Sequence, residues 1–260
     1  MRVDALYRFL EERLPRALSA EWDNDGLSCL PDPARQVRRV LVALDATEQM
    51  VEKAICEQFD VLLTHHPLLF RGVKELTPAH TVPRKLLRLI RGDVAAMSFH
   101  TRLDAVDGGV NDILARMLGL TEVSRFGPVG EELGRIGSLP QAVTVEEYAQ
   151  TVCEKLQIPF VLQAGTKTVQ RVAVLGGEGG DFVDAAIAAG ADLFLAGRIG
   201  YHRMLDGAEE GIALIEAGHF ATEVAVCHRL AELVQQADPA IAVEVYTKPA
   251  IRVAANSKGV

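Results

Sequence analysis

Short apolar runs alternate along the first half of the chain with longer stretches of helical periodicity. A continuous apolar run bounded by polar residues is typical of a buried strand, and apolar positions three and four apart are typical of a helix. Thr47 is a suitable N-cap for the helix that follows the first run. The predicted strands are residues 37–45, 60–64 and 93–98, and the predicted helices are residues 47–58, 82–91 and 110–118.

The second half shows the same alternation. Thr144 and Glu147 have the spacing of a capping box at the start of one of its helices. Strands separated by helices of about ten residues indicate βαβ units. We therefore predict an α/β fold with two lobes and mainly parallel sheets. The predicted strands are residues 133–139, 171–175, 191–196, 212–216 and 241–246, with helices at 144–156, 182–189 and 222–236.

The division between the lobes is expected in the stretch 124–134, which is rich in glycine and charge. This gives a first lobe of residues 1–125 and a second of residues 126–260, interlocked with the first. With 260 residues the chain is long for one core and short for two independent domains, so one two-lobed unit is the simplest arrangement.

Residues that can bind metal follow three of the predicted strands. In parallel α/β sheets the loops at the carboxyl ends of the strands converge on one edge, where ligands bind. Imidazole and carboxylate groups together suit Zn, Fe, Mn, Ni or Co. A metal site is therefore expected at this edge, between the lobes. Its candidate ligands are His65, His66, Asp104, His219 and Glu223, with His100 beside them.

The number and spacing of these residues favour two divalent ions. Neighbouring side chains in an extended chain point in opposite directions, so one ion does not easily accept both His65 and His66. His219 and Glu223 are four residues apart and share a face of a helix. Taken singly, Glu223 also suits a helix N-terminus and Asp104 a turn. The coincidence of three such sites is what favours a metal centre.

Two other segments leave alternatives open. The glycine-rich stretch 176–180 suits either an anion-binding loop or a tight turn, and it matches no known phosphate-binding motif. The stretch 22–27, Trp-Asp-Asn-Asp-Gly-Leu, either lines the site or forms a structural turn packed by Trp22.

Composition narrows the classes of partner. The formal charge of −8 disfavours nucleic-acid binding. No window of eighteen apolar residues is present, so no membrane span is expected, and the charged amphipathic N-terminus does not resemble a signal peptide. The four cysteines form no Cys-x-x-Cys pair, which is typical of reduced thiols in a cytoplasmic protein.

Five motifs in a fixed order carry a family resemblance that extends over essentially the whole chain. Together they resemble the GTP cyclohydrolase I type 2 homologs, also described as dinuclear-metal-centre proteins. The motifs are WDNDGL at 22–27, LLTHHPL at 62–68, FHTRLDA at 99–105, GGVND at 108–112 and GHFATE at 218–223.

The resemblance implies metal ligands at His65, His66, Asp104, His219 and Glu223, and an auxiliary histidine at His100. It also implies a homohexameric toroid with the sites facing inward, and attack of a metal-bound hydroxide on the purine ring of GTP with loss of formate. The chain departs from the family at Arg102, where relatives often have Asn, and at Arg198, where they often have an acid. It also lacks the central insertion of longer members.

The leading hypothesis is a metal-dependent hydrolase acting on a small molecule such as a nucleotide. In it two ions activate water and His100 serves as the proton shuttle, since imidazole titrates near neutral pH. The alternative is a non-catalytic metal-binding assembly factor, metal store or regulatory protein. The absence of an obvious nucleophile or base outside the metal ligands keeps the alternative open.

Overall fold

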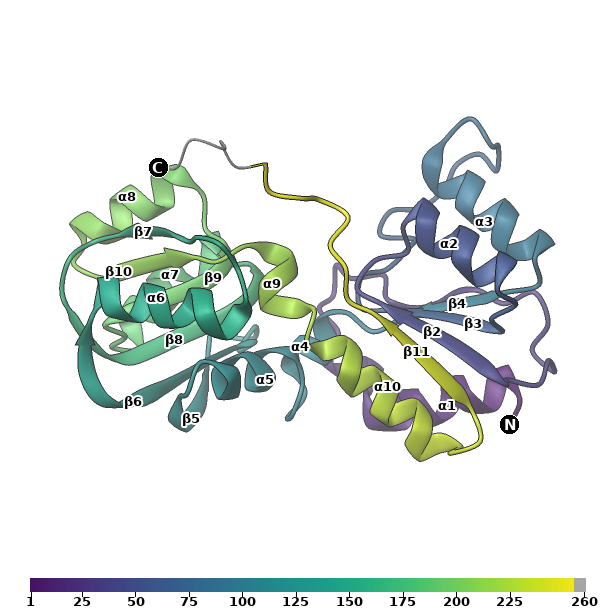
Figure 1. Ribbon diagram of the computed structural model, residues 1–260, viewed down its shortest axis with the longest axis horizontal. Helices are drawn as coiled ribbons and strands as arrows, with labels where there is room; N and C mark the ends of the chain where they lie inside the picture. The colour runs from purple at the N-terminus through teal and green to yellow at the C-terminus, as the bar shows by residue number, and fades with distance from the viewer. Residues whose placement is uncertain (255–260) are drawn as a thin grey trace.

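The computed structural model describes residues 1–254 and contains two α/β lobes side by side (Figure 1). The first lobe is built on a five-stranded sheet with strand order β1-β4-β3-β2-β11. All neighbouring strands in it are parallel except β1, which pairs antiparallel with β4. The strands are β1 (Gly26–Cys29), β4 (Ala95–Ser98), β3 (Val61–Thr64), β2 (Arg39–Ala43) and β11 (Ala242–Tyr246).

Helices cover both faces of this sheet, because its central strands are apolar on both sides. One face packs against α1 (Val3–Arg13) and α10 (Val226–Ala237). The other packs against α2 (Glu48–Cys56) and α3 (Thr81–Arg91). Thr47 caps α2 through its side chain, as the sequence predicts.

The second lobe is built on a six-stranded sheet with order β5-β6-β8-β9-β10-β7. One face packs against α5 (Val110–Met117) and α6 (Val145–Leu156), and the other against α7 (Val183–Ala188) and α8 (Tyr201–Glu209). The predicted capping box of Thr144 and Glu147 is present at the start of α6. The strands are β5 (Thr121–Phe126), β6 (Gly134–Thr144), β8 (Thr168–Glu178), β9 (Leu193–Arg198), β10 (Ala213–Glu216) and β7 (Leu162–Ala164).

The two-lobed α/β class is as predicted, but the expectation of mainly parallel strands fails in the second sheet. There β8, β9 and β10 are parallel, whereas β5, β6 and β7 each pair antiparallel. β6 corresponds to the predicted strand 133–139. From β6 the chain passes through α6 and β7 to β8, which pairs antiparallel with β6. β1, β5, β7 and the helix α8 were not predicted from the sequence.

The path of the chain between the lobes differs from a division at residue 125. α10 and β11 return to the first lobe after the second is complete, and β11 pairs with β2 (Figure 1). The amino group of Met1 lies 2.9 Å from Asp238, just before this last strand. The first sheet is thus assembled from both ends of the described chain, and the second sheet from its middle.

The helix predicted at 222–236 is divided. A short helix, α9 (His219–Glu223), lies between the lobes, and α10 begins at Val226 (Figure 1). Two further short helical segments complete the fold near the site: α4 (Thr101–Ala105) and the 3-10 turn Gly180–Phe182. A third, Arg16–Leu18, follows α1. Within residues 1–254, every helix is too short or too polar to cross a membrane.

Candidate metal centre

The carboxyl end of β3 delivers two imidazoles to the interface between the lobes. The chain bends at His65 and His66 directly after the strand, and the Thr64 hydroxyl donates to the carbonyl of His66 at 2.8 Å. Because of this bend the two rings lie 4.9 Å apart, on the same side. The expectation that they point in opposite directions is therefore wrong, and it no longer supports a second ion.

Hydrogen bonds to Nδ1 set the tautomer of three histidines. His65 Nδ1 lies 2.9 Å from the Phe99 carbonyl, and His66 Nδ1 lies 2.8 Å from Asp45 Oδ1. His100 Nδ1 lies 3.1 Å from both oxygens of Asp23. A carbonyl or carboxylate only accepts, so each Nδ1 carries a proton, and Nε2 is the ring nitrogen that an ion would bind. This is how metal-binding histidines are oriented in proteins.

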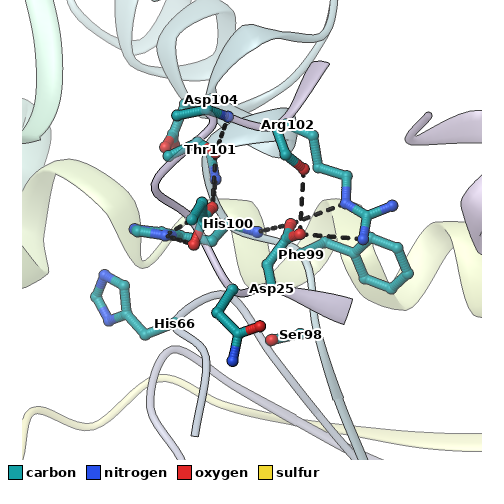
Figure 2. Close-up of polar contacts among 12 residues, drawn as sticks. Asp25, His66, Ser98, Phe99, His100, Thr101, Arg102 and Asp104 are labelled. Atoms are coloured by element: carbon teal, nitrogen blue, oxygen red, sulfur yellow. Dashed lines mark hydrogen bonds and ion pairs between the residues drawn. The ribbon is translucent and has the colours of Figure 1, made fainter. Parts of the chain in front are cut away.

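The segment after β4 is held by two buried carboxylates of the stretch 22–27. Asp23 accepts from the backbone N–H of Thr101 and from its hydroxyl, at 3.1 and 2.6 Å, in addition to His100. Asp25 accepts from the N–H of His100 at 3.0 Å and from Arg102 (Figure 2). This stretch is thus a turn that positions His100 and starts α4. Trp22 does not pack it, since its side chain is 57% exposed.

The remaining ligand candidates come from α4 and α9. Asp104 lies in the single turn of α4, with Oδ1 3.6 Å from His65 Nε2. His219 and Glu223 share one face of α9, as their spacing predicts. Glu223 Oε2 lies 3.1 Å from the Nε2 atoms of both His66 and His219, which are 3.4 Å apart. All five predicted ligands therefore meet, and we refer to them as the His/carboxylate cluster.

Buried atoms without hydrogen-bond partners show that this cluster suits a cation. Among the described residues, His65 Nε2, Asp104 Oδ1 and Glu223 Oε2 are buried side-chain atoms that no hydrogen bond satisfies. Leaving such atoms unpaired is costly, and most buried polar atoms in proteins have partners. All three are acceptors and face one another, so a positive ion satisfies them together. Ligand atoms of two triads also lie within 4.8 Å of one another: His65, His66, His100 and His66, His219, Glu223.

In the cluster without an ion, imidazoles and carboxylates pair with one another. Burial acts to lower the pKa of His66, but the hydrogen bonds to Asp45 and Glu223 outweigh it and raise the pKa to about 10, so an ion would have to displace a proton there. Burial lowers the pKa of His65 to about 3, so its imidazole is neutral. Burial, and next the charge of Glu223, raises the pKa of Asp104 to about 7. Burial also acts to raise the pKa of Glu223, but the facing imidazoles of His219 and His66 outweigh it and hold that pKa well below its usual range. Glu223 is therefore an ionised carboxylate surrounded by nitrogen donors.

Glycines allow the second lobe to approach this carboxylate. Gly177, near the end of β8, has a φ of +71°, and a Cβ there would overlap Glu223 Oε1. The N–H of Gly177 is 3.2 Å from the hydroxyl of Thr222, and that of Gly176 is 2.7 Å from Asn111 Oδ1. The stretch 176–180 is therefore a close-packing segment against α9, and its first part lines the site.

Sequence reasoning missed two residues that support the cluster. Asp45 holds the ring of His66 through Nδ1. Its position at the end of the predicted strand 37–45, beside the other strand ends that carry candidate ligands, could have indicated a place at the site. Gly177 could not be identified from sequence, because its role depends on the packing of β8 against α9.

Of the two departures from the family pattern, Arg102 is fully buried and pairs through two nitrogens with Asp25 (Figure 2). Arg198 is exposed, 3.9 Å from Glu178.

A cleft of about 820 Å³ opens in front of the cluster. Residues of both lobes line it, together with Pro249, Ala250 and Ile251, which follow β11. His66, His100, Asp104, His219 and Glu223 all reach this cleft. The cluster is thus accessible to a small molecule, which a purely structural ion site does not require.

The fold and the site define a class: two-lobed α/β proteins with a histidine–carboxylate cluster in the cleft between the lobes. A family model described as Duf34/NIF3 (NGG1p interacting factor 3) matches residues 1–251. The chain belongs to this family.

Relatives of known sequence and structure agree. The chain is 32% identical to the GTP cyclohydrolase 1 type 2 homolog of Clostridium perfringens over 242 residues, covering 91% of this chain and 92% of the relative. A Staphylococcus aureus protein of solved structure superposes with a TM-score of 0.87 at 26% identity, covering 98% and 99% of the two chains. Reduced HcgD from Methanocaldococcus jannaschii superposes with a TM-score of 0.82 at 27% identity, covering 94% and 97%. The resemblance inferred from the motifs is confirmed.

Proposed function

We propose that this protein binds two divalent metal ions in the His/carboxylate cluster and is a metal-dependent hydrolase. The observation that carries the proposal is the convergence of three buried, unpaired acceptor atoms, on His65, Asp104 and Glu223. Divalent ions bound there would act as Lewis acids and lower the pKa of water towards neutrality. The ligand types do not distinguish Zn, Fe, Mn, Ni or Co.

Glu223 is the proposed shared ligand. One of its oxygens lies 3.1 Å from the donor atoms of His66 and His219, and the other lies 3.9 Å from His65 Nε2. A carboxylate with imidazoles on both sides can serve two cations and offset their repulsion. His65 and Asp104 would then serve one ion, and His66 and His219 the other.

His100 is the proposed proton-transferring residue. Its Nδ1 is held by Asp23, and its ring lies 5.3 Å from that of His65 and 5.5 Å from that of His66, facing the cleft. Burial acts to lower the pKa of His100, but the bond to Asp23 and the charge of Asp104 outweigh it and raise the pKa. A protonated Nε2 facing the cleft can donate to a leaving group.

Metal stoichiometry and turnover test the proposal together. Elemental analysis of metal-loaded protein should give two ions per chain, and a saturating value of one contradicts the dinuclear site. A panel of small hydrolysable metabolites, including GTP as suggested by the names of the relatives, should reveal turnover that His219→Ala abolishes. If the loaded protein binds two ions and hydrolyses nothing in a broad panel, the non-catalytic alternative is supported instead.

Assembly and location belong to the proposal as well. The family resemblance implies a homohexamer, and light scattering of the metal-loaded protein should give six times the mass of one chain. Free thiols at Cys29, Cys56, Cys153 and Cys227 suit a reducing, cytoplasmic location. The expected partner is a small molecule, with neither nucleic acid nor membrane involved.

A further inference from the structure

The rim of the cleft contains three aromatic rings in mutual contact. Trp22 and Phe70 lie edge to face with ring centroids 6.0 Å apart, and each lies just over 6 Å from the ring of His100. Trp22 remains 57% exposed and Phe70 48% exposed, and both line the cleft. Large aromatic side chains half-exposed beside a reactive cluster are unusual unless a ligand covers them.

The charge of the cleft is one-sided. Carboxylates outside the cluster line it at Asp45, Glu131, Glu178 and Asp181, and no lysine or arginine among residues 1–254 does. Arg198 lies near the lining, but its side chain is 67% exposed and faces Glu178 at 3.9 Å. Proteins bind phosphate groups with arginine, lysine or helix N-termini, and acidic side chains oppose such binding.

From these two features we infer that the cleft binds a planar heterocycle without phosphate groups, stacked against Trp22 and Phe70. This inference rests on the proposed metal site, because the stacked ring would present its polar edge to the ions. In a ring-opening reaction on GTP the base would have to lie at the ions. Its triphosphate would then extend along the cleft, whose lining outside the cluster includes Glu131, Glu178 and Asp181. A neutral base, nucleoside or related ring meets no such repulsion.

Trp22 is the only tryptophan of the chain, so its fluorescence reports on this rim alone. Zinc-loaded protein should be titrated with guanosine, benzimidazole, GTP and inorganic tripolyphosphate, with correction for ligand absorbance. Guanosine or benzimidazole should quench Trp22, with guanosine binding at least about tenfold more tightly than GTP. Tripolyphosphate should neither quench Trp22 nor compete with guanosine.

Substitutions identify the stacking residues. Phe70→Ala should weaken binding of the neutral probe by roughly 10- to 100-fold, the range expected when one stacking partner is lost. Trp22→Ala, measured by calorimetry, should do the same, and Trp22→Phe should restore most of the affinity. Phe160→Ala is the control, because Phe160 is 53% exposed and does not line the cleft.

Metal content, measured on the same samples, separates the two proposals. Suppose that two ions are bound. If neither neutral probe changes the fluorescence of Trp22, this inference is overturned and the metal site stands. The same holds if GTP binds more tightly than guanosine and tripolyphosphate competes with guanosine. If the neutral probes stack on Trp22 while zinc fails to bind, the metal site fails and the aromatic subsite remains.

Discussion

At the scale of single residues, Glu223 decides whether the cluster is a metal centre or a set of ion pairs. Glu223→Gln keeps the size of the side chain and removes its charge. Two cations a few ångströms apart repel strongly without an anion between them, so the variant should lose at least one of two zinc-binding events in calorimetry. Glu178→Gln, an exposed acid of the same cleft, should keep both. Two undiminished events in Glu223→Gln would exclude it as a shared ligand.

Gly177 provides a second test, which adds atoms instead of removing charge. Gly177→Ala places a methyl group against Glu223 Oε1 and should reduce zinc affinity about tenfold or more. Gly190→Ala is matched for backbone strain, since its φ is +75° and nothing lies within 4 Å of the added Cβ. Both should lose about 1 kcal/mol of stability from the positive φ. Equal zinc affinity in the two variants would contradict close packing at Gly177.

The candidate ligands could be predicted from sequence because each follows an apolar strand, and the edge of a parallel sheet collects such residues. The residues that hold these side chains in place could not be predicted from sequence. Asp23 and Asp25 lie more than seventy residues from His100 and Arg102 along the chain, and only the folded structure shows which partners they have.

At the scale of elements, Asp60 joins the starts of β2 and β3. Its carboxylate accepts the N–H groups of Arg38 and Arg39 at 2.7 and 3.0 Å, and Arg35 at 2.8 Å. Burial acts to raise the pKa of Asp60, but these hydrogen bonds outweigh it and lower the pKa. A lowered pKa stabilises the fold above the unfolded-state pKa, and this stabilisation is lost as the pH falls through the folded value.

Asp60→Asn should therefore lower the free energy of unfolding by about 1.5–3 kcal/mol at pH 7, the range for hydrogen bonds to a charged group. The difference from wild type should shrink as the pH falls below about 4. Urea unfolding of metal-free protein at several pH values measures it. Asp206→Asn, an exposed change of the same charge, controls for net charge. A difference independent of pH would mean that the charge of Asp60 contributes nothing.

Helices and strands could be predicted where a local sequence pattern, such as an apolar run or a helix cap, was strong. The buried strands β2, β3 and β4 and the caps at Thr47 and Thr144 follow from local pattern alone. β5 was missed because its residues are almost all exposed, and β7 because it has only three residues at a sheet edge. The sequence predicted mainly parallel strands in the second sheet, but β5, β6 and β7 pair antiparallel. Strand direction depends on the connections between the strands and not on their composition.

At the scale of the whole molecule, the candidate ligands come from both lobes. His65, His66 and Asp104 follow strands of the first sheet, and Glu223 lies in α9 against β8 and β9 of the second. Ions bound between them should stabilise both lobes at once.

Metal binding that excludes the unfolded state adds about 2.7 kcal/mol at a free metal concentration of 100 Kd. For a chain of this size, this amount should raise Tm by about 5–10 °C. Scanning calorimetry before and after removal of metal by a chelator measures the shift. In Glu223→Gln the shift should be much reduced. An unchanged Tm after complete removal of metal would show that the site does not join the lobes.

The return of the last strand to the first sheet affects how the protein is made. A ribosome has synthesised β1 to β4 long before it reaches β11, and α10, which covers one face of that sheet, is also late. The nascent first lobe therefore has an open strand edge at β2 and an apolar face that α1 alone covers, until the middle of the chain has been synthesised. His219 and Glu223 emerge just before these closing elements, so binding of the proposed ions and closure of the first lobe would fall in the same late interval of translation. A chain released early would lack both, and its exposed edge would make it a target for chaperones and proteases.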